Sequence, residues 1–142
     1  MRLSTRCSDS RAAARSRGLA YYGGIRYNGH MSVENITPRA AAELIARDNV
    51  LLIDVREQRE WDTGRIDGSR LVPLDQFRAD PEPYLSKDLP IIFICARGVR
   101  SLTAAKLAER LGYERLYNLE GGTLAWARDG LQLVTDAAVR AA

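Results

Sequence analysis

The chain has 142 residues, of which 46% are hydrophobic and 27% charged, a balance typical of one globular domain. This composition excludes a disordered chain, a collagen-like chain and a coiled coil. The most apolar run, Ile91 to Ala96, is far too short to cross a bilayer, so we expect no membrane contact. The two cysteines, Cys7 and Cys95, provide neither a disulfide framework nor a zinc-type cluster.

The net charge of +3 is distributed unevenly along the chain. Residues 1–30 contain six arginines and one acidic residue, which gives this segment a net charge of +5. The other 15 basic and 17 acidic residues give a net charge of −2. Because the basic excess lies entirely in the first segment, the sequence predicts neither a nucleic-acid-binding domain nor a nucleic-acid partner.

Residues 1–31 are rich in Arg, Ser, Gly and Ala and have no sustained apolar period. Three interpretations remain open: a transit peptide, a leader left by cloning (Gly29-His30-Met31 resembles a cloning scar), or sequence upstream of a true start at Met31. We favour the latter two. We expect a disordered leader at 1–31, one domain at 32–136 and a short tail at 137–142. The lack of disulfides predicts a cytoplasmic location, or an organellar matrix if the leader is a transit peptide.

From Ser32 onward, helical and strand patterns alternate. In chain order, we predict a helix over 38–47, a strand over 50–53, a helix over 57–63, a strand over 70–72, a helix over 74–78, a strand over 91–94, a helix over 101–111, a strand over 116–118 and a helix over 122–128. This alternation favours an α/β fold with a parallel sheet that has helices on both faces.

Start and stop signals support the two longest helices. Thr37 is a predicted N-cap followed by Pro38 at the first helical position, and Gly112 is a predicted C-cap. The expected apolar faces are Ala40, Ala41, Leu44 and Ile45 in the first, and Leu102, Ala105, Leu107, Ala108 and Leu111 in the second. Ligands of such folds lie beyond the carboxyl ends of the strands, which points to the residues after Ile53 and Ile94.

The strand at 91–94 is followed by Cys95, a glycine-containing loop and a helix. Gly98 allows the loop amides to converge on one point, where the helix adds its positive N-terminal end and Arg97 and Arg100 add charge. These groups favour the thiolate and predict a lowered pKa for Cys95. A lone cysteine is more often an inert core residue, but a core position has no need of converging donors. We therefore expect Cys95 to be the nucleophile, with an anion-binding loop formed by Ala96, Arg97, Gly98, Val99, Arg100 and Ser101.

The residues that are missing narrow the chemistry further. His30 is the only histidine and lies in the leader, so a cysteine–histidine pair is implausible. The domain has no second cysteine to resolve a disulfide, too few soft ligands for a metal and no feature that requires a cofactor. A thiolate acting alone on an anion remains, which suits sulfur transfer or phosphate-ester hydrolysis. A cysteine phosphatase places five residues between Cys and Arg, whereas four separate Cys95 from Arg100, so the loop is one residue short for phosphate.

The chain resembles the rhodanese family over nearly all of residues 32–134. The motifs that carry the resemblance are Leu52-Ile53-Asp54-Val55-Arg56, Glu60-Trp61, Gly64-Arg65-Ile66-Asp67-Gly68-Ser69, the loop Cys95 to Ser101, and Glu120-Gly121-Gly122 with Trp126 and Gly130. The resemblance implies a five-stranded parallel sheet flanked by helices. It also implies a sulfurtransferase in which Cys95 takes the outer sulfur of thiosulfate and passes it, as a persulfide, to cyanide or a thiol. Arg65 stands where the family often has His, and we expect it to support the fold.

For the other residues of the family motifs, we expect structural roles. We expect Asp54 and Arg56, which end a strand near the site, to form an ion pair or to support the loop rather than to take part in catalysis. The remaining expectations are solvation or loop bracing for Glu60 and Asp67, core packing for Trp61 and Trp126, and a turn for Gly121 and Gly122.

Two rival functions stay open. In the first, the domain carries a persulfide between partner proteins, or serves a partner as a regulatory module, and turns over thiosulfate poorly. In the second, it is a phosphatase or arsenate reductase on a related fold, which the short loop opposes. The expected partners are thus a small anionic sulfur donor such as thiosulfate, a thiol or cyanide acceptor, and a protein sulfur donor or acceptor in the first rival function.

Overall fold

The computed structural model describes residues 33–137. The expected leader, with Cys7 and His30, and the tail after Ala137 lie outside the described residues. The elements are β1 (Val33–Ile36), α2 (Pro38–Arg47), β2 (Leu51–Asp54), α3 (Gln58–Thr63), β3 (Arg70–Leu71), α4 (Leu74–Ala79), the 3₁₀ helix η2 (Glu82–Tyr84), β4 (Ile91–Ile94), α5 (Val99–Arg110), β5 (Leu116–Leu119) and α6 (Gly122–Arg128).

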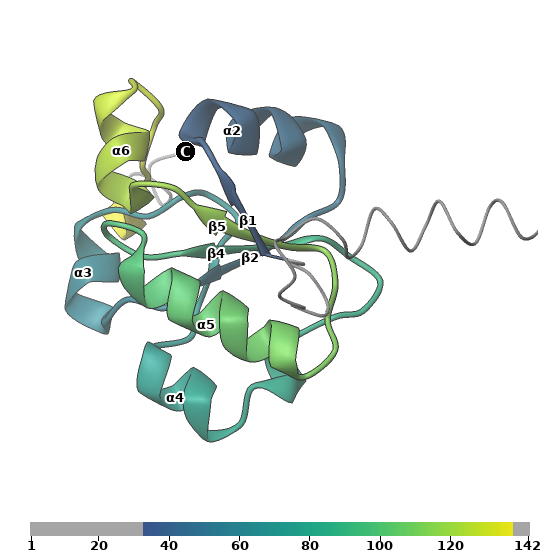
Figure 1. The fold of residues 1–142 in the computed structure, drawn as a ribbon. Coiled ribbons are helices and arrows are strands. Elements are labelled where there is room, and N and C mark those ends of the chain that lie inside the picture. Colours follow the sequence, from purple (N-terminus) through teal and green to yellow (C-terminus); the bar gives the residue numbers. More distant parts are fainter. Residues whose placement is uncertain (1–32, 138–142) are drawn as a thin grey trace, which may run out of the picture. The chain divides into compact units, whose positions relative to one another are not determined.

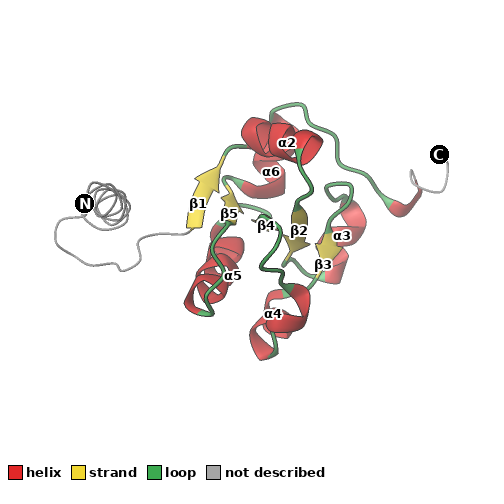
Figure 2. Cartoon of the chain, turned by 90° about the vertical axis from the view of Figure 1, so that its right-hand side faces the viewer, coloured by secondary structure: helices red, strands yellow, loops and turns green. Residues whose placement is uncertain are grey.

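The five strands form one parallel sheet in the order β1-β5-β4-β2-β3 (Figure 2). The neighbouring strands β2 and β4 are paired so that Asp54 at the end of β2 lies beside Ile94 at the end of β4. The segments that follow these two strands therefore leave the sheet at the same edge, where ligands of parallel α/β folds bind.

The residue pattern alone missed β1. Its apolar residues, Val33 and Ile36, stand only at its two ends, and the intervening Glu34 and Asn35 are exposed. An edge strand has one neighbour and needs no continuous apolar run, so neither alternation nor an apolar run marks it. The number of five strands was implied by the rhodanese resemblance, and the structure confirms it.

Helices cover both faces of the sheet (Figure 1). The helices α2 and α6 pack on one face with Ile92 and Ile94, whereas α4 and α5 pack on the other with Ile91 and Phe93. Successive residues of β4 therefore enter two separate cores, and a fully buried side chain of this size contributes roughly 1.5–3 kcal/mol. The predicted α/β fold is thus confirmed.

Both predicted helix faces need a correction. Ala40 is exposed, because the buried face of α2 consists of Pro38, Ala41 and Leu44. The helix α5 begins at Val99, two residues earlier than predicted, and its C-cap residue Leu111 is 36% exposed. The early start has a physical reason, since Gly98 in a left-handed conformation is the N-cap and the helix runs from the next residue. The buried residues of α5 are Ser101, Ala104, Ala105 and Ala108, of which the predicted face contained only Ala105 and Ala108.

The two tryptophans differ in their surroundings. Trp126 is buried in the core, and its indole N–H donates to a main-chain carbonyl. Trp61 is half-buried and belongs to neither core cluster, and the guanidinium of Arg65 lies 4.7 Å from its ring centroid. Core packing was therefore correct for Trp126 and wrong for Trp61. Arg65 joins distant parts of the fold, because its backbone pairs with Val134 and its guanidinium bonds Asp136 at 2.6 Å.

Candidate active site

The loop that carries the candidate nucleophile starts directly after β4 and ends where α5 begins. Cys95 is its first residue, and Gly98, the N-cap of α5, has a φ of +95°. A β-carbon at Gly98 would lie 3.2 Å from the amide nitrogen of Gly121 and from the carbonyl oxygen of Leu119. Glycine therefore serves both the left-handed turn and the close approach of the loop before α6.

The loop rests on the first turn of α6. The amide of Thr123 donates to the carbonyl of Cys95 at 2.9 Å, and the amide of Leu124 donates to the carbonyl of Ala96 at 3.1 Å. Gly122 has a φ of +64°, and a β-carbon there would overlap both of these carbonyl groups. The predicted turn at Gly121 and Gly122 is therefore the start of α6, packed against the loop.

The sulfur of Cys95 is surrounded by hydrogen-bond donors although the residue is only 1% exposed. The amides of Gly98 and Ser101 donate to Sγ at 3.1 and 3.3 Å, and the Ser101 hydroxyl oxygen lies 3.2 Å away. Burial raises the pKa of Cys95, but the Ser101 hydroxyl and the amides of Ser101, Arg97 and Gly98 outweigh it, so the net pKa is lowered. This direction agrees with the expectation from the sequence.

Asn118 of β5 lies beneath the loop and was missed by sequence reasoning. It is 3% exposed, its Oδ1 accepts the Ser101 hydroxyl at 2.5 Å, and its Nδ2 donates to the carbonyl of Gly98 at 3.1 Å and to Oδ1 of Asn35 at 3.0 Å. In the sequence, Asn118 is marked only as a polar residue inside an apolar strand. The pairing of β4 with β5 brings Asn118 to the loop, and the sequence does not reveal this pairing.

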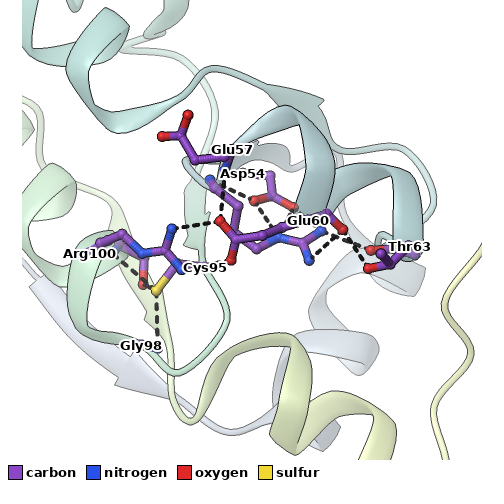
Figure 3. A network of polar contacts seen from close by, with 10 residues as sticks. Asp54, Glu57, Glu60, Thr63, Cys95, Gly98 and Arg100 are labelled. Atoms are coloured by element: carbon purple, nitrogen blue, oxygen red, sulfur yellow. Dashed lines mark hydrogen bonds and ion pairs between the residues drawn. The ribbon is translucent and has the colours of Figure 1, made fainter.

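Arg100 faces a carboxylate. Two of its guanidinium nitrogens donate to the two oxygens of Glu60, each at 2.9 Å, and Figure 3 shows this group next to the Cys95 sulfur and turned toward Glu60. The hydrogen bonds from Arg100 lower the pKa of Glu60 to about 2 against the opposing effect of burial, and Glu60 in turn raises the pKa of Arg100. Glu60 thus braces the loop across 40 residues of sequence, whereas Asp67 is exposed.

Asp54 and Arg56 form an ion pair at the end of β2. Nη2 of Arg56 lies 2.9 Å from Oδ2 of Asp54, and the two side chains are 4% and 0% exposed. Arg56 also donates to the carbonyls of Glu60 and Gly64, at 3.3 and 2.8 Å. The pair therefore joins the end of β2 to the middle of α3 and to its C-cap Gly64, and through Glu60 to Arg100.

Arg97 is the exposed cation of the loop. Within residues 33–137 its side chain has no ion-pair or hydrogen-bond partner, and its charge faces solvent. Two apolar side chains are exposed beside the loop: Val99 at 72% and Leu124, whose amide donates to the Ala96 carbonyl, at 49%. Beside the cysteine, the charge of Arg97 therefore lies next to apolar surface.

A groove of about 520 Å³ lies beside the loop, between α3 and α6. Its lining includes Ala96 of the loop, Arg59 and Glu60 of α3, and Leu124 and Ala127 of α6. Apolar atoms form most of this surface, although charged side chains also line it, so it can receive an organic group next to the loop.

The described residues contain no group of three or more His, Cys, Asp and Glu side chains that could hold a metal ion. None of the helices within 33–137 has the length and apolar character needed to cross a membrane.

The structure thus combines a parallel α/β sheet with a buried cysteine at the end of a central strand, whose sulfur accepts hydrogen bonds from main-chain amides. The Rhodanese-like domain family model matches residues 37–129. The chain is 30% identical over 105 residues to the thiosulfate sulfurtransferase GlpE of Actinobacillus succinogenes, an alignment that covers 74% of this chain and 94% of that protein. The chain belongs to the rhodanese-like family, whose relatives include sulfurtransferases.

Solved structures support the same family. The crystal structure of a rhodanese-related protein from Thermoplasma volcanium matches with a TM-score of 0.66 and 29% identity, covering 72% of this chain and 99% of that one. Other curated relatives are much longer. The chain covers 31% of a tRNA uridine(34) hydroxylase from Protochlamydia amoebophila, at 32% identity over 64% of the chain. It covers 24% of the probable adenylyltransferase/sulfurtransferase MoeZ of Mycobacterium tuberculosis, at 35% identity over 66% of the chain.

Proposed function

We propose that this domain transfers the sulfane sulfur of thiosulfate, through a persulfide on Cys95, to cyanide or to a thiol acceptor. The observation that carries the proposal is the environment of the Cys95 sulfur. It accepts hydrogen bonds from two loop amides, and its pKa is lowered although no histidine or carboxylate within residues 33–137 bonds it. Such donors stabilise negative charge on sulfur before and after transfer.

The first half-reaction needs no proton. The Cys95 thiolate attacks the outer sulfur of thiosulfate, a new S–S bond forms, and the S–S bond of the donor breaks as sulfite leaves with the electron pair. In the second half-reaction the acceptor, cyanide or a thiolate, attacks the outer sulfur of the persulfide. The Cys95 thiolate is the leaving group, and the enzyme returns to its starting state.

The two loop arginines take different roles in this proposal. Arg97 is exposed and unpaired within the described residues, so it attracts the thiosulfate dianion. Arg100 is engaged by Glu60 through two hydrogen bonds and holds the shape of the loop. The sequence predicts only that both arginines add charge to the anion-binding loop.

The persulfide-carrier alternative keeps one supporting observation. Val99 and Leu124 are exposed apolar side chains that flank the loop, and such surface suits a protein donor or acceptor. The MoeZ relative is named as both an adenylyltransferase and a sulfurtransferase. We infer a partner protein for the present chain only if it acts as a persulfide carrier.

The intact mass of the protein after incubation with thiosulfate tests the proposal. We expect the wild type and the Cys7→Ser control to gain the mass of one sulfur atom, which cyanide or dithiothreitol removes, and Cys95→Ser to gain none. A gain that occurs only with a cysteine desulfurase would favour the carrier. Loading of Cys95→Ser, or no loading from any donor, would contradict persulfide chemistry at Cys95.

A further inference from the structure

Four residues close a ring of hydrogen bonds around the candidate nucleophile. The amide of Gly98 donates to Sγ of Cys95, and the carbonyl of Gly98 accepts from Nδ2 of Asn118. Oδ1 of Asn118 accepts the hydroxyl of Ser101, whose oxygen lies 3.2 Å from Sγ. Ser101 is 0% exposed and Asn118 3% exposed, so a bond lost from this ring is not replaced by bulk water.

The carbonyl of Gly98 fixes the orientation of the Asn118 amide. A main-chain carbonyl only accepts hydrogen bonds, so the amide nitrogen, and not the amide oxygen, must face it. The second hydrogen of the same nitrogen goes to Asn35. The amide oxygen is thereby left facing Ser101 at 2.5 Å, and the single hydroxyl proton of Ser101 lies between Asn118 and Cys95.

One hydroxyl proton cannot serve both neighbours. When Cys95 is a thiol, its S–H can donate to the Ser101 oxygen while the Ser101 hydroxyl donates to Asn118. When Cys95 is a thiolate, a lone pair of Ser101 would face the negative sulfur, so the hydroxyl turns to Sγ and leaves the Asn118 oxygen without that bond. The pKa of Cys95 thus depends on how firmly Asn118 holds the proton.

We propose that Asn118 is a positioning residue which competes with the Cys95 thiolate for the hydroxyl of Ser101 and so sets the fraction of thiolate. The inference deepens the proposed function, because the thiolate is the species that attacks the sulfur donor. Asn118 does not touch the sulfur in any contact of the described residues. It bonds both Ser101 and the carbonyl of Gly98, and the competition proposed here is for the hydroxyl of Ser101.

Charged groups approach Cys95 from other directions than Asn118. Arg97 and Arg100 belong to the loop and α5, and Glu60 of α3 neutralises Arg100. Behind the site, Asp54 and Arg56 form their own pair at the end of β2. From the side of β5 and α6, the groups that bond the loop are uncharged: the side-chain amide of Asn118 and the main-chain amides of Thr123 and Leu124. Variants of Asn118 and Ser101 leave all of these ion pairs in place.

The test measures how much Ser101→Ala changes the pKa of Cys95. This change is compared between the protein with Asn118 and the variants Asn118→Asp, Asn118→Ala and Asn35→Asp. The pKa is measured from the pH dependence of alkylation by iodoacetamide, in the full chain with Cys7→Ser so that only Cys95 reacts. In the Asn118 background, Ser101→Ala is expected to raise the pKa by about half a unit to one unit, since a donor to the charged sulfur is lost.

The size of this increase should depend on residue 118. It should shrink in Asn118→Asp, because a carboxylate holds the Ser101 hydroxyl more strongly than an amide does. The substitution also removes the donor to the Gly98 carbonyl, but this loss is present with and without Ser101→Ala and so cancels in the increase. It should grow in Asn118→Ala, which frees the hydroxyl for the sulfur. Asn35→Asp is the matched control, because it adds a similar charge on the exposed neighbouring strand and still accepts from Asn118 Nδ2, so the increase there should equal that of the wild type.

Equal increases in all four backgrounds would overturn the proposal and leave Asn118 with a structural role only. If Asn118→Asp does not fold, as judged by circular dichroism, the Asn118→Ala comparison decides by itself. Loading of the wild type with sulfur is measured separately, so a failure of the proposed transfer reaction cannot be mistaken for a failure of this inference.

Discussion

Glu60→Gln removes the negative charge that faces Arg100 and keeps the length of the side chain. An amide oxygen remains to accept the Glu57 amide, so the capping box of α3 is preserved. The pKa of Glu60 is lowered from 4.5 to about 2 in the folded protein, which corresponds to roughly 3 kcal/mol as an upper limit. The side chains of Arg100 and Glu60 are 36% and 28% exposed, so solvent screening reduces the expected loss of unfolding free energy to about 1–2 kcal/mol at pH 7.

The pH dependence separates this ion pair from other effects of the substitution. A carboxyl whose folded-state pKa is lowered stabilises the protein above its unfolded pKa, near 4.5, and this contribution is lost as the pH falls through about 2. In urea unfolding, the difference between the wild type and Glu60→Gln should therefore be the same at pH 7 and pH 5 and fall to less than half at pH 3. Glu43→Gln, at an exposed position of α2, is the control and should show almost no difference. A difference for Glu60→Gln that is as large at pH 3 as at pH 7 would refute the reasoning.

Three other substitutions test the site. Gly122→Ala should lower the unfolding free energy by more than ~3 kcal/mol, because its β-carbon would overlap two loop carbonyls. The control Gly130→Ala is also at positive φ but in open space, and it should lower the unfolding free energy by about 1–2 kcal/mol. Equal losses in thermal unfolding would contradict the close packing of α6 on the loop. Asp54→Asn leaves the buried Arg56 without its counter-charge and should cost about 3–5 kcal/mol in urea unfolding, and a loss under ~1 kcal/mol would show that the pair is dispensable. Arg97→Ala should raise the KM for thiosulfate at low salt, with a smaller effect at high salt and an unchanged melting temperature; an unchanged KM would remove Arg97 from substrate attraction.

The central strands of the fold could be predicted because burial on both faces leaves a continuous apolar run. The run Ile91–Ile94 was predicted with the same bounds that the structure gives, and β2 differs by one residue at each end. The edge strand β1 has neither such a run nor an alternating pattern, and its polar centre hid it. The start of α5 was misplaced for a different reason, since Gly98 was taken as a loop residue and is also the N-cap of the helix.

The loop could be predicted as a candidate site because its chemistry is contiguous in sequence. Its partners could not, because they depend on how distant segments pack. Glu60 meets Arg100 across 40 residues, and Asn118 meets Ser101 across 17. An isolated acidic residue on a short polar helix and a lone asparagine in a strand have many structural explanations. Only the packing of α3 and the pairing of β4 with β5 select these contacts.

The distribution of charge at the mouth bears on the choice between sulfur transfer and phosphate-ester hydrolysis. A bound phosphate dianion is best held by an arginine that is free to donate two hydrogen bonds to it. Arg100 already donates in this way to Glu60, and the buried Arg56 is paired with Asp54. Neither guanidinium therefore has two adjacent N–H donors that are available for a phosphate. The sulfur itself faces uncharged amides of Gly98 and Ser101, which suit the single charge of a thiolate or a persulfide. With Arg97 left to attract an anion from solvent, the arrangement favours a reaction in which the dianion delivers its sulfur and departs.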